Sequence, residues 1–462
     1  MVNGHNEKNG LPAPQKEVHP VKSSEAGILP KAKLFNRVKK FLFVSQESLS
    51  GDLAWQIKKE GHEVKVYIKS EKDKDVYDGF LEKVSHWKEY IAWADVIVFD
   101  DVGFGTEADN LRKAGKLVVG GSSYTDKLEE NREFGQSEMK RVGMLTLPHW
   151  DFNDYDAALK FIEENPGRYV YKPSGFMASN SKGLLFLGKE EDGKDLYEII
   201  KSNKEVLQKR VKQFQLQKFA TGVEIAVGAF FNGNDFIYPI NVNFEHKKLF
   251  PGDIGPFTGE MGTLMYWSNP NTIFKLTLEK IKEDVKKSGY VGYIDINCIA
   301  NARGVYPLEF TTRFGYPTIS IQEEGVISEW GDFLFSIAGG KPYDLKTKKG
   351  FQIGVVCATP PFPHNDKEEV EIYRDLSIIF KKPNLDGMHL GDVKMIDGNW
   401  RIAGYTGYAL VVTGSGTTVE DARKQVYSRI ENIILQNILY RTDIGLGWYE
   451  DSDRLQTWGY LY

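Results

Sequence analysis

Lys172 ends a short apolar run and is followed by a loop of small residues. The segment reads Lys172-Pro173-Ser174-Gly175-Phe176-Met177-Ala178-Ser179-Asn180-Ser181-Lys182-Gly183. Such a loop can bring several backbone N–H groups close to a phosphate while the lysine neutralises charge. A hairpin tip beside an ordinary surface lysine would have the same composition, so the residues alone leave both interpretations open.

A second polar set falls on two neighbouring apolar runs joined by the turn 301–304. The turn brings Asp295 and Glu309 to one end of a hairpin, and Glu309, Thr311 and Arg313 share a face of an extended strand. Adjacent carboxylates repel unless a cation lies between them, and magnesium is the oxygen-seeking candidate. Arg313 could then bind a carboxylate or phosphate. A cross-strand salt bridge from Arg313 to a carboxylate is the alternative.

A third segment is rich in glycine and reads Gly255-Pro256-Phe257-Thr258-Gly259-Glu260-Met261-Gly262. Three glycines and a proline predict a shaped loop instead of a strand. A plain cluster of turns is the alternative.

Other motifs in the sequence do not fit the functional sites that they resemble. Gly188 to Lys194 has P-loop spacing, but Asp195 stands where magnesium binding needs Ser or Thr. Gly103-Phe104-Gly105 lacks the third glycine of a dinucleotide site. The eight histidines form no closely spaced pair, and no Gly-x-Ser-x-Gly elbow occurs.

The elements expected around these motifs define the fold class. Short apolar runs alternate with helical segments up to residue 123, which indicates βαβ units and a parallel sheet. Strands are predicted there at residues 41–44, 64–68, 96–99 and 117–119, with helices at 53–59 and 107–114. Further on, helices are predicted at 131–142, 157–164 and 272–289, a hairpin at 169–172 and 184–187, and strands at 215–219, 224–231, 236–243, 293–300 and 305–310. Strands followed by helices in this way indicate an α+β module.

The C-terminal part is predicted to be strand-rich from residues 351–358 and to end in a helix. That helix presents one apolar face, made by Val419, Ala422, Val426, Ile430 and Ile433.

Composition excludes several classes of protein. The chain has 462 residues, which is enough for about three domains. Its net charge of −5 does not fit a nucleic-acid binder, and no apolar stretch reaches the length of a membrane helix. Cys298 and Cys357 cannot form a disulfide framework, so a reducing, cytoplasmic location fits best.

The three motifs occur in the order and spacing of an ATP-grasp enzyme, and more closely resemble glycinamide ribonucleotide synthetase, also called phosphoribosylamine–glycine ligase. Residues 255–262 resemble the family's Gly-Pro-Asn-Thr-Gly-Gly-Met-Gly, and residues 309–317 its Glu-Phe-Asn-Val-Arg-Phe-Gly-Asp-Pro. The close of the chain at residues 440–445 resembles its Arg-x-Asp-Ile-Gly. The resemblance covers residues 41–445.

The resemblance implies an ATP-grasp fold, of α/β and α+β class, in four parts. These are a flexible tail (1–35), an N-terminal α/β pre-ATP-grasp domain (36–125), a two-lobed ATP-grasp module with its hinge near 217–220 (126–340), and a C-terminal mixed α/β domain (341–462).

The resemblance also implies roles for individual residues. Lys172 and Arg313 would be catalytic, and Asp295, Glu309 and Thr311 would bind Mg²⁺ or Mn²⁺. ATP would be bound by Lys172, Ser174, Ser181, Gly183, Gln217, Lys218, Phe219, Ala220 and Glu224. The substrates would be bound by His246, Lys247, Gly255, Pro256, Thr258, Gly259, Gly262 and Arg313.

Departures from the family's pattern concentrate on the substrate side. The glycine-rich N-terminal turn is replaced by residues 46–51, an asparagine of the glycine motif by Phe257, and its following glycine by Glu260. The asparagine metal ligand is replaced by Thr311, a weaker ligand.

These features predict an ADP-forming carboxylate–amine ligase that acts through an acyl phosphate and has a divergent substrate site. A genuine phosphoribosylamine–glycine ligase of purine biosynthesis and a nucleotide-binding module without catalysis are the alternatives. The expected partners are small-molecule carboxylate and amine substrates, not nucleic acid or membrane, and the chain is expected to be a monomer or homodimer.

Overall fold

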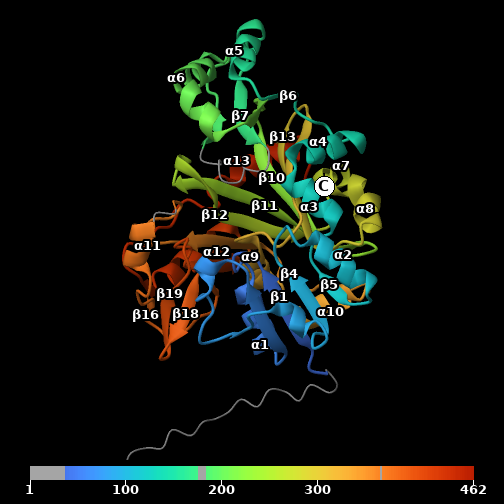
Figure 1. Cartoon of the computed structure of the whole chain (residues 1–462), viewed down its shortest axis with the longest axis vertical. Coiled ribbons are helices and arrows are strands. Elements are labelled where there is room, and N and C mark those ends of the chain that lie inside the picture. Colours follow the sequence, from blue (N-terminus) through green and yellow to red (C-terminus); the bar gives the residue numbers. More distant parts are fainter. Residues whose placement is uncertain (1–36, 175–183, 365–366) are drawn as a thin grey trace, which may run out of the picture. The chain divides into compact units, whose positions relative to one another are not determined.

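A five-stranded parallel sheet, in the order β3-β2-β1-β4-β5, opens the described part of the chain (Figure 1). This computed structural model describes residues 37–174, 184–364 and 367–462, and residues 38–462 form one unit. The predicted parallel sheet is confirmed, because the apolar runs are buried on both faces of their strands. Its strands are β1 (Lys40–Ser45), β2 (Glu63–Ile68), β3 (Glu82–Lys83), β4 (Val96–Phe99) and β5 (Leu117–Val119). The helical segments of this region are α1 (Gly51–Lys59), η1 (Glu71–Asp73), η2 (Trp87–Tyr90), α2 (Gly105–Lys113), α3 (Ser123–Glu130) and α4 (Arg132–Arg141).

A four-stranded antiparallel sheet, β6-β9-β7-β8, follows and has a hydrophobic cluster of its own. The predicted hairpin is present, since Val170 pairs with Leu187 in antiparallel register. Helices α5 and α6 lie next to each other on this sheet (Figure 1). The elements are β6 (His149–Phe152), α5 (Tyr155–Glu164), β7 (Tyr169–Ser174), β8 (Phe186–Leu187), α6 (Lys194–Arg210) and β9 (Gln213–Lys218).

An eight-stranded antiparallel sheet, β14-β13-β10-β11-β12-β15-β20-β17, forms the centre of the fold. The α+β prediction is confirmed by this sheet. Its strands are β10 (Val223–Asn232), β11 (Phe236–Phe250), β12 (Ile254–Ser268), β13 (Val291–Asn301), β14 (Gly304–Thr311), β15 (Phe351–Cys357), β17 (Met388–Leu390) and β20 (Leu410–Gly416).

The prediction that residues 255–262 form a loop was wrong, because they belong to strand β12. The glycines are compatible with this strand since its pairing with β11 shifts register between His246 and Lys248 and again before Phe250. Such bulges accept backbone angles that favour glycine, and Gly255 has a φ of +87°. Gly262 is required for packing, because a Cβ there would lie 2.6 Å from the carbonyl oxygen of Gly354.

The prediction of a single helix at 272–289 was also wrong, because the helix is interrupted at Thr277. Helix α7 (Thr272–Leu276) ends there and α8 (Leu278–Lys287) begins. The Thr277 hydroxyl donates to the Ile273 carbonyl (2.6 Å), and its ψ of −92° is not helical. A short side chain that bonds the backbone in this way competes with helix continuation.

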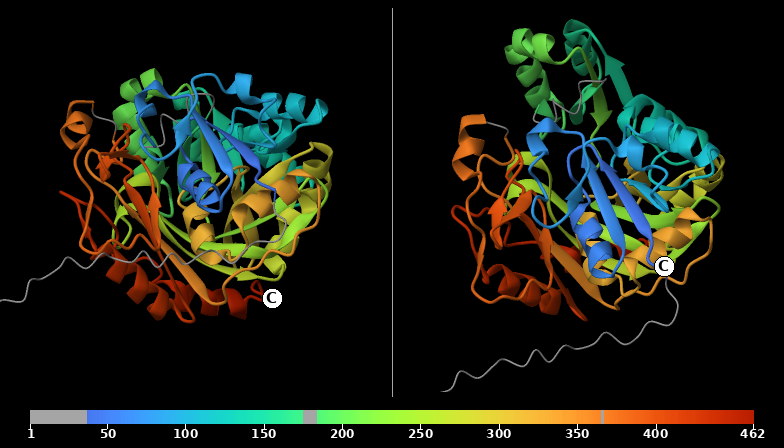
Figure 2. Two further views of the ribbon diagram at one scale, coloured as in Figure 1. Left: turned by 90° about the horizontal axis from the view of Figure 1, so that it is seen from below. Right: turned by 60° about the horizontal axis from the view of Figure 1, so that its bottom comes forward.

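The central sheet runs through the predicted domain boundary at residue 340, because β12 pairs with β15. The other predicted boundaries stay predictions. In Figure 2 the orange-red C-terminal segment lies beside the blue parallel sheet, and the Tyr77 N–H donates to the Val393 carbonyl across this contact (2.8 Å). The remaining elements are α9 (Thr318–Gly325), α10 (Trp330–Ala338), α11 (Lys367–Tyr373), β16 (Ile379–Phe380), β18 (Val393–Ile396), β19 (Asn399–Ile402), α12 (Val419–Ile430), β21 (Ile433–Ile434) and α13 (Trp448–Thr457).

Three side-chain predictions can be compared with these elements. Helix α12 buries the predicted apolar residues Val419 to Ile430, while Ile433 lies beyond it in β21. Both cysteines are free and buried. Among the described residues, no helix has the length and apolar character needed to cross a membrane.

Candidate functional site

Lys172 lies in β7 and is buried, with 8% of its surface exposed. Burial, reinforced by the charge of Arg132, lowers the pKa of its ammonium to about 7. Glu309 and Glu224 act in the opposite direction. A buried amine with so low a pKa gains a full charge most easily beside an anion. Lys172 is therefore suited to a phosphate.

Lys247 connects the acidic residues of three strands. Its Nζ lies 3.0 Å from Glu224 Oε1 on β10, 3.4 Å from Glu245 Oε2 on β11 and 3.8 Å from Glu309 Oε1 on β14. These carboxylates hold the pKa of the ammonium well above its usual range, although burial opposes them. Because Glu309 and Glu224 also act on Lys172, the two lysines belong to one electrostatic group.

Three buried carboxyl groups lie beside this network. Burial, reinforced by neighbouring carboxylates, raises the pKa values of Glu245, Glu260 and Asp295. Glu260 Oε1 and Asp295 Oδ1 have no hydrogen-bond partner among the described residues. Buried carboxylates without partners are unfavourable unless they are protonated or bind a cation. The arrangement therefore fits a divalent cation.

The predicted metal ligands are brought together by the antiparallel pairing of β13 and β14. Asp295 is opposite Thr311, and Asn297 is opposite Glu309. Asn297 donates to Glu245 Oε1 (3.4 Å), and its own Oδ1 has no partner within the described part of the chain. Asn297 and Glu245 were not predicted as ligands. The period-2 alternation that places Asn297 beside Asp295, and Glu245 beside Lys247, was the signal available in the sequence.

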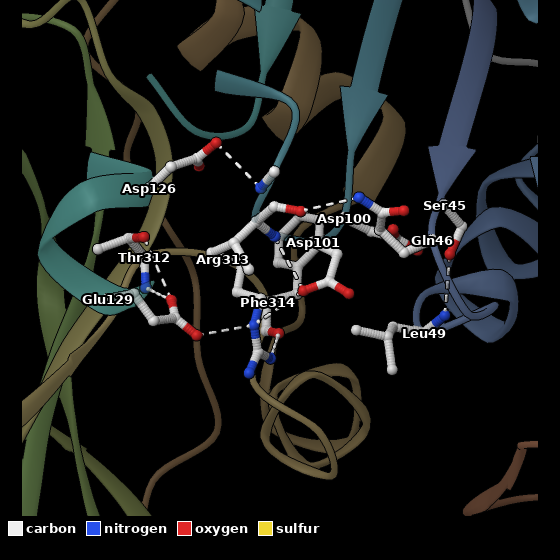
Figure 3. Close-up of polar contacts among 12 residues, drawn as sticks. Ser45, Gln46, Leu49, Asp100, Asp101, Asp126, Glu129, Thr312, Arg313 and Phe314 are labelled. Atoms are coloured by element: carbon white, nitrogen blue, oxygen red, sulfur yellow. Dashed lines mark hydrogen bonds and ion pairs between the residues drawn. The ribbon is translucent and has the colours of Figure 1, made fainter. Parts of the chain in front are cut away.

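Arg313 follows β14 and reaches the loops of the parallel sheet (Figure 3). Its Nε lies 3.1 Å from Asp101 Oδ1 and 3.0 Å from Glu129 Oε1, and the Thr312 N–H donates to Glu129 Oε2 (2.7 Å). Burial raises the pKa of Asp101 to about 7, although Arg313 opposes the shift. Arg313 also interacts electrostatically with Asp295, so it borders the carboxylate group.

The loops after β1 and β4 meet beside Arg313. The Ser50 N–H donates to Asp100 Oδ2 (3.0 Å), and Gln46 Nε2 donates to the Val102 carbonyl (3.3 Å). Gln46 and Asp100 are labelled near Asp101 in Figure 3. Strand order changes direction between β1 and β4, and ligands of parallel α/β sheets bind at the carboxyl ends of strands at such a point. The candidate site therefore extends from Lys172 to this crevice.

The predicted adenine hinge lies at the end of β9. Gln217 is buried within the strand, and Arg168 stacks 3.4 Å from the ring centroid of Phe219. The N–H groups of Lys218 and Phe219 donate to the carbonyls of Pro148 and Arg168 (2.8 and 2.9 Å). Ala220 follows directly and donates to no backbone carbonyl of the described residues, so its N–H can meet a ligand.

Other predicted residues lie apart from this group. His246 Nε2 accepts from the Gly445 N–H (3.4 Å), because strand alternation turns it away from Glu245 and Lys247. Thr258 donates to the Lys247 carbonyl (2.9 Å) and Lys248 to the Gly255 carbonyl (3.0 Å), which fixes the glycine-rich segment to β11. Pro256 and Gly259 are in the same segment. Ser174 ends β7, and Ser181 and Gly183 lie outside the described residues.

Residues 130–319 match the family model described as phosphoribosylglycinamide synthetase, ATP-grasp (A) domain. The phosphoribosylamine–glycine ligase of Streptococcus pneumoniae is 25% identical over 364 residues, covering 77% of this chain and 84% of that protein. The ligase of the same name from Clostridium acetobutylicum is 25% identical over 430 residues, covering 88% of this chain and 99% of that protein.

Solved structures show the same fold. The phosphoribosylamine–glycine ligase of Thermotoga maritima has a TM-score of 0.66 at 23% identity, covering 88% of this chain and all of that one. A biotin carboxylase from Campylobacter jejuni has a TM-score of 0.58 at 15% identity, covering 92% of this chain and 98% of that one.

Proposed function

Residues 130–319 are an ATP-grasp domain of the phosphoribosylglycinamide synthetase type, and from this premise we propose that the chain is an ADP-forming ligase that joins a carboxylate to an amine. The observation that carries the proposal is the electrostatic group that joins Lys172 and Lys247. Lys172, suited to a phosphate, interacts electrostatically with Lys247, and Lys247 in turn pairs with Glu245, which acts on Glu260 and Asp295, the carboxyl groups suited to a divalent cation.

The proposed reaction has two steps. A carboxylate oxygen of the first substrate attacks the γ-phosphorus of ATP, so that ADP leaves and an acyl phosphate forms. The amine nitrogen of the second substrate then attacks the acyl carbon, phosphate leaves, and the nitrogen loses a proton. No covalent enzyme intermediate is needed.

The chain's own residues would offset the charge of the phosphates and of the acyl phosphate, and accept the proton of the amine. Lys172 gains a proton beside the phosphates and offsets their charge. Arg313 is held in place by Asp101 and Glu129 and would offset the charge of the acyl phosphate from this fixed position. Asp101, with a pKa raised to about 7, would accept the proton that the amine loses near neutral pH.

Residues available to a metal ion fit Mg²⁺. Asp295 Oδ1, Asn297 Oδ1 and Glu260 Oε1 are buried oxygens without partners among the described residues, and Glu309 lies across the ladder from Asn297. Hard oxygen ligands of this kind suit Mg²⁺ or Mn²⁺. When bound, the ion would shield the negative charge of the ATP phosphates.

The acceptor is proposed to be an amine other than phosphoribosylamine. A phosphate group needs cations that are free to meet it. Arg313, shared with Asp101 and Glu129, is assigned here to the acyl phosphate and leaves no second cation at this point for a ribose phosphate, and Glu260 is buried instead of facing solvent. Phe257 lies under Lys248 Nζ, 3.6 Å from the ring centroid. An acid-rich crevice of this kind favours a cationic amine.

Phosphoribosylamine–glycine ligase activity is the second candidate function. It is favoured by the shared name of the curated relatives, which the chain covers over 84–99% of their length in the two cases given above. In that reaction glycine would supply the carboxylate and phosphoribosylamine the amine.

A phosphate-release screen tests the proposal. Purified protein with ATP and Mg²⁺ would be supplied with amino acids paired with amines, including glycine with freshly generated phosphoribosylamine. Release that needs both substrates supports a ligase, and product mass identifies the acceptor. Lys172→Met serves as the inactive control and Lys209→Met, on an exposed helix face, as the matched active control. ATP binding without turnover on any pair would favour a nucleotide-binding module.

A further inference from the structure

A largely buried polar triad lies where three distant segments of the chain meet. Asp52 comes from α1, Glu323 from α9 and His389 from β17. Each side chain offers one ligand atom, and these atoms lie within 4.8 Å of one another. It is the one such group of three among the described residues. Asp52 and His389 are more than nine-tenths buried, at 8% and 9% exposure.

The hydrogen bonds of His389 define which ring nitrogen can bind a cation. Its Nε2 lies 3.0 Å from the Thr413 hydroxyl, which itself donates to Glu324 Oε2 (3.0 Å). Because Thr413 uses its hydrogen on Glu324, it accepts from His389, so Nε2 carries the ring proton. Nδ1 then faces Asp52 Oδ2 at 2.7 Å, a hydrogen-bond distance, so a cation bound there would displace the proton that these two atoms share.

Glu324, which accepts the last hydrogen bond from His389 through Thr413, has several further partners. Glu324 also accepts from Ser415 (2.8 Å) and pairs with Lys348 (2.7 Å) and Arg429 (3.0 Å). A ligating histidine usually donates its second N–H to an outer group that fixes the ring, and Thr413 with Glu324 supplies that group.

Each carboxylate has an oxygen atom within 4.8 Å of the ligand nitrogen of His389. Asp52 Oδ1 accepts from the Leu390 N–H (3.0 Å), which leaves Oδ2 directed at His389 Nδ1. Glu323 Oε1 is buried and has no hydrogen-bond partner in the described part of the chain. Burial and the charge of Asp52 disfavour the ionised form of Glu323 when nothing positive lies between them.

We infer that Asp52, Glu323 and His389 bind a first-row divalent transition-metal ion, with Zn²⁺ as the probe that tests it. Two carboxylate oxygens and one imidazole nitrogen form a ligand set that such ions accept, and two negative charges neutralise a divalent ion. The ion would link α1 to α9 and β17, so its role is to hold these segments together. It is separate from the Mg²⁺ that the ligase reaction would use.

Metal analysis of the full chain tests this inference. Protein stripped with chelator, loaded with Zn²⁺ and desalted should retain about one ion per chain. The isosteric variant Glu323→Gln, which removes one charge without creating a cavity, should lose most of it, as should His389→Gln. The exposed His364→Gln is the matched control and should bind as the parent does.

Two further measurements keep the result independent of folding defects. Co²⁺ loading should give visible absorption bands of a histidine–carboxylate site in the parent and not in Glu323→Gln. Zn²⁺ at 100 times its dissociation constant should raise the Tm of the parent by about 3 °C and leave that of Glu323→Gln unchanged. Retention of no Zn²⁺ above the assay background by the parent would overturn the inference. Equal retention by parent and Glu323→Gln would overturn it too.

Discussion

Thr311 stands directly opposite Asp295 in the antiparallel ladder of β13 and β14. Two residues further along the ladder Asn297 pairs with Glu309, so a hydroxyl, an amide and two carboxyl groups lie together on these two strands. This pairing is the frame on which the proposed Mg²⁺ site depends.

Removal of either ladder carboxylate should abolish turnover. Asp295→Ala and Glu309→Ala would each remove an oxygen ligand of the proposed ion, whereas the exposed Glu205→Ala should keep parental activity. Circular dichroism would show that the variants are folded. Parental turnover of Glu309→Ala under saturating Mg²⁺ would mean that Glu309 serves only as a partner of Lys247.

Thr311→Asn should retain or increase activity, because an amide oxygen is a better Mg²⁺ ligand than a hydroxyl. The readout is the Mg²⁺ concentration that gives half-maximal turnover, which should fall. Thr311→Val, of the same size without the hydroxyl, is the matched variant and should raise this Mg²⁺ concentration. The same Mg²⁺ requirement in all three proteins would exclude Thr311 from the site.

Lys172→Ala should weaken ATP binding by about 1.5–3 kcal/mol, the range for a hydrogen bond to a charged group. Calorimetry measures this loss, and Lys209→Ala is the exposed control. An unchanged ATP affinity would remove Lys172 from the phosphate site.

ATP binding should also take up a proton at pH 8. With a pKa of about 7, the free Lys172 amine is mostly neutral at that pH, and a bound phosphate favours its charged form. ATP affinity should therefore fall as pH rises from 7 to 9. Calorimetry in buffers of different ionisation enthalpy detects the uptake, which should be absent in Lys172→Ala.

The stability of the chain should respond to pH through Glu260. Its folded-state pKa is raised above the ordinary value by burial and by Glu245, so the folded chain holds a proton that the unfolded chain releases above pH 4.5. Stability from this group is therefore lost as pH rises. Glu260→Gln should match the parent near pH 4.5 and have the higher Tm at pH 8 without divalent ions. A lower Tm at pH 8 would contradict this.

Phosphoribosylamine should be a poor acceptor. Assay with ATP, glycine and freshly generated phosphoribosylamine should give little glycinamide ribonucleotide. Formation at a kcat/KM of roughly 10⁴ M⁻¹s⁻¹ or more would instead establish the second candidate function.

Local patterns predicted the strands well, and they predicted the Asp295–Thr311 hairpin because its two strands are adjacent in sequence. They failed at residues 255–262, where bulged pairing with β11 accommodates glycines that otherwise favour a loop. They also could not show that strand alternation turns His246 toward Gly445. The contact between Asp52 and His389 joins residues 337 positions apart, and no local pattern specifies such a contact.

The pairing of β12 with β15 limits how the chain can be divided. A chain that ended at Gly340 would lose β15, and the backbone groups of β12 from Gly262 to Tyr266 would be left without their partners. Exposed strand edges of this kind pair with other molecules and aggregate. The segment matched to the ATP-grasp family is therefore not a unit that can be transplanted alone, and any recombination with a related chain would have to exchange β12, β15 and β20 together.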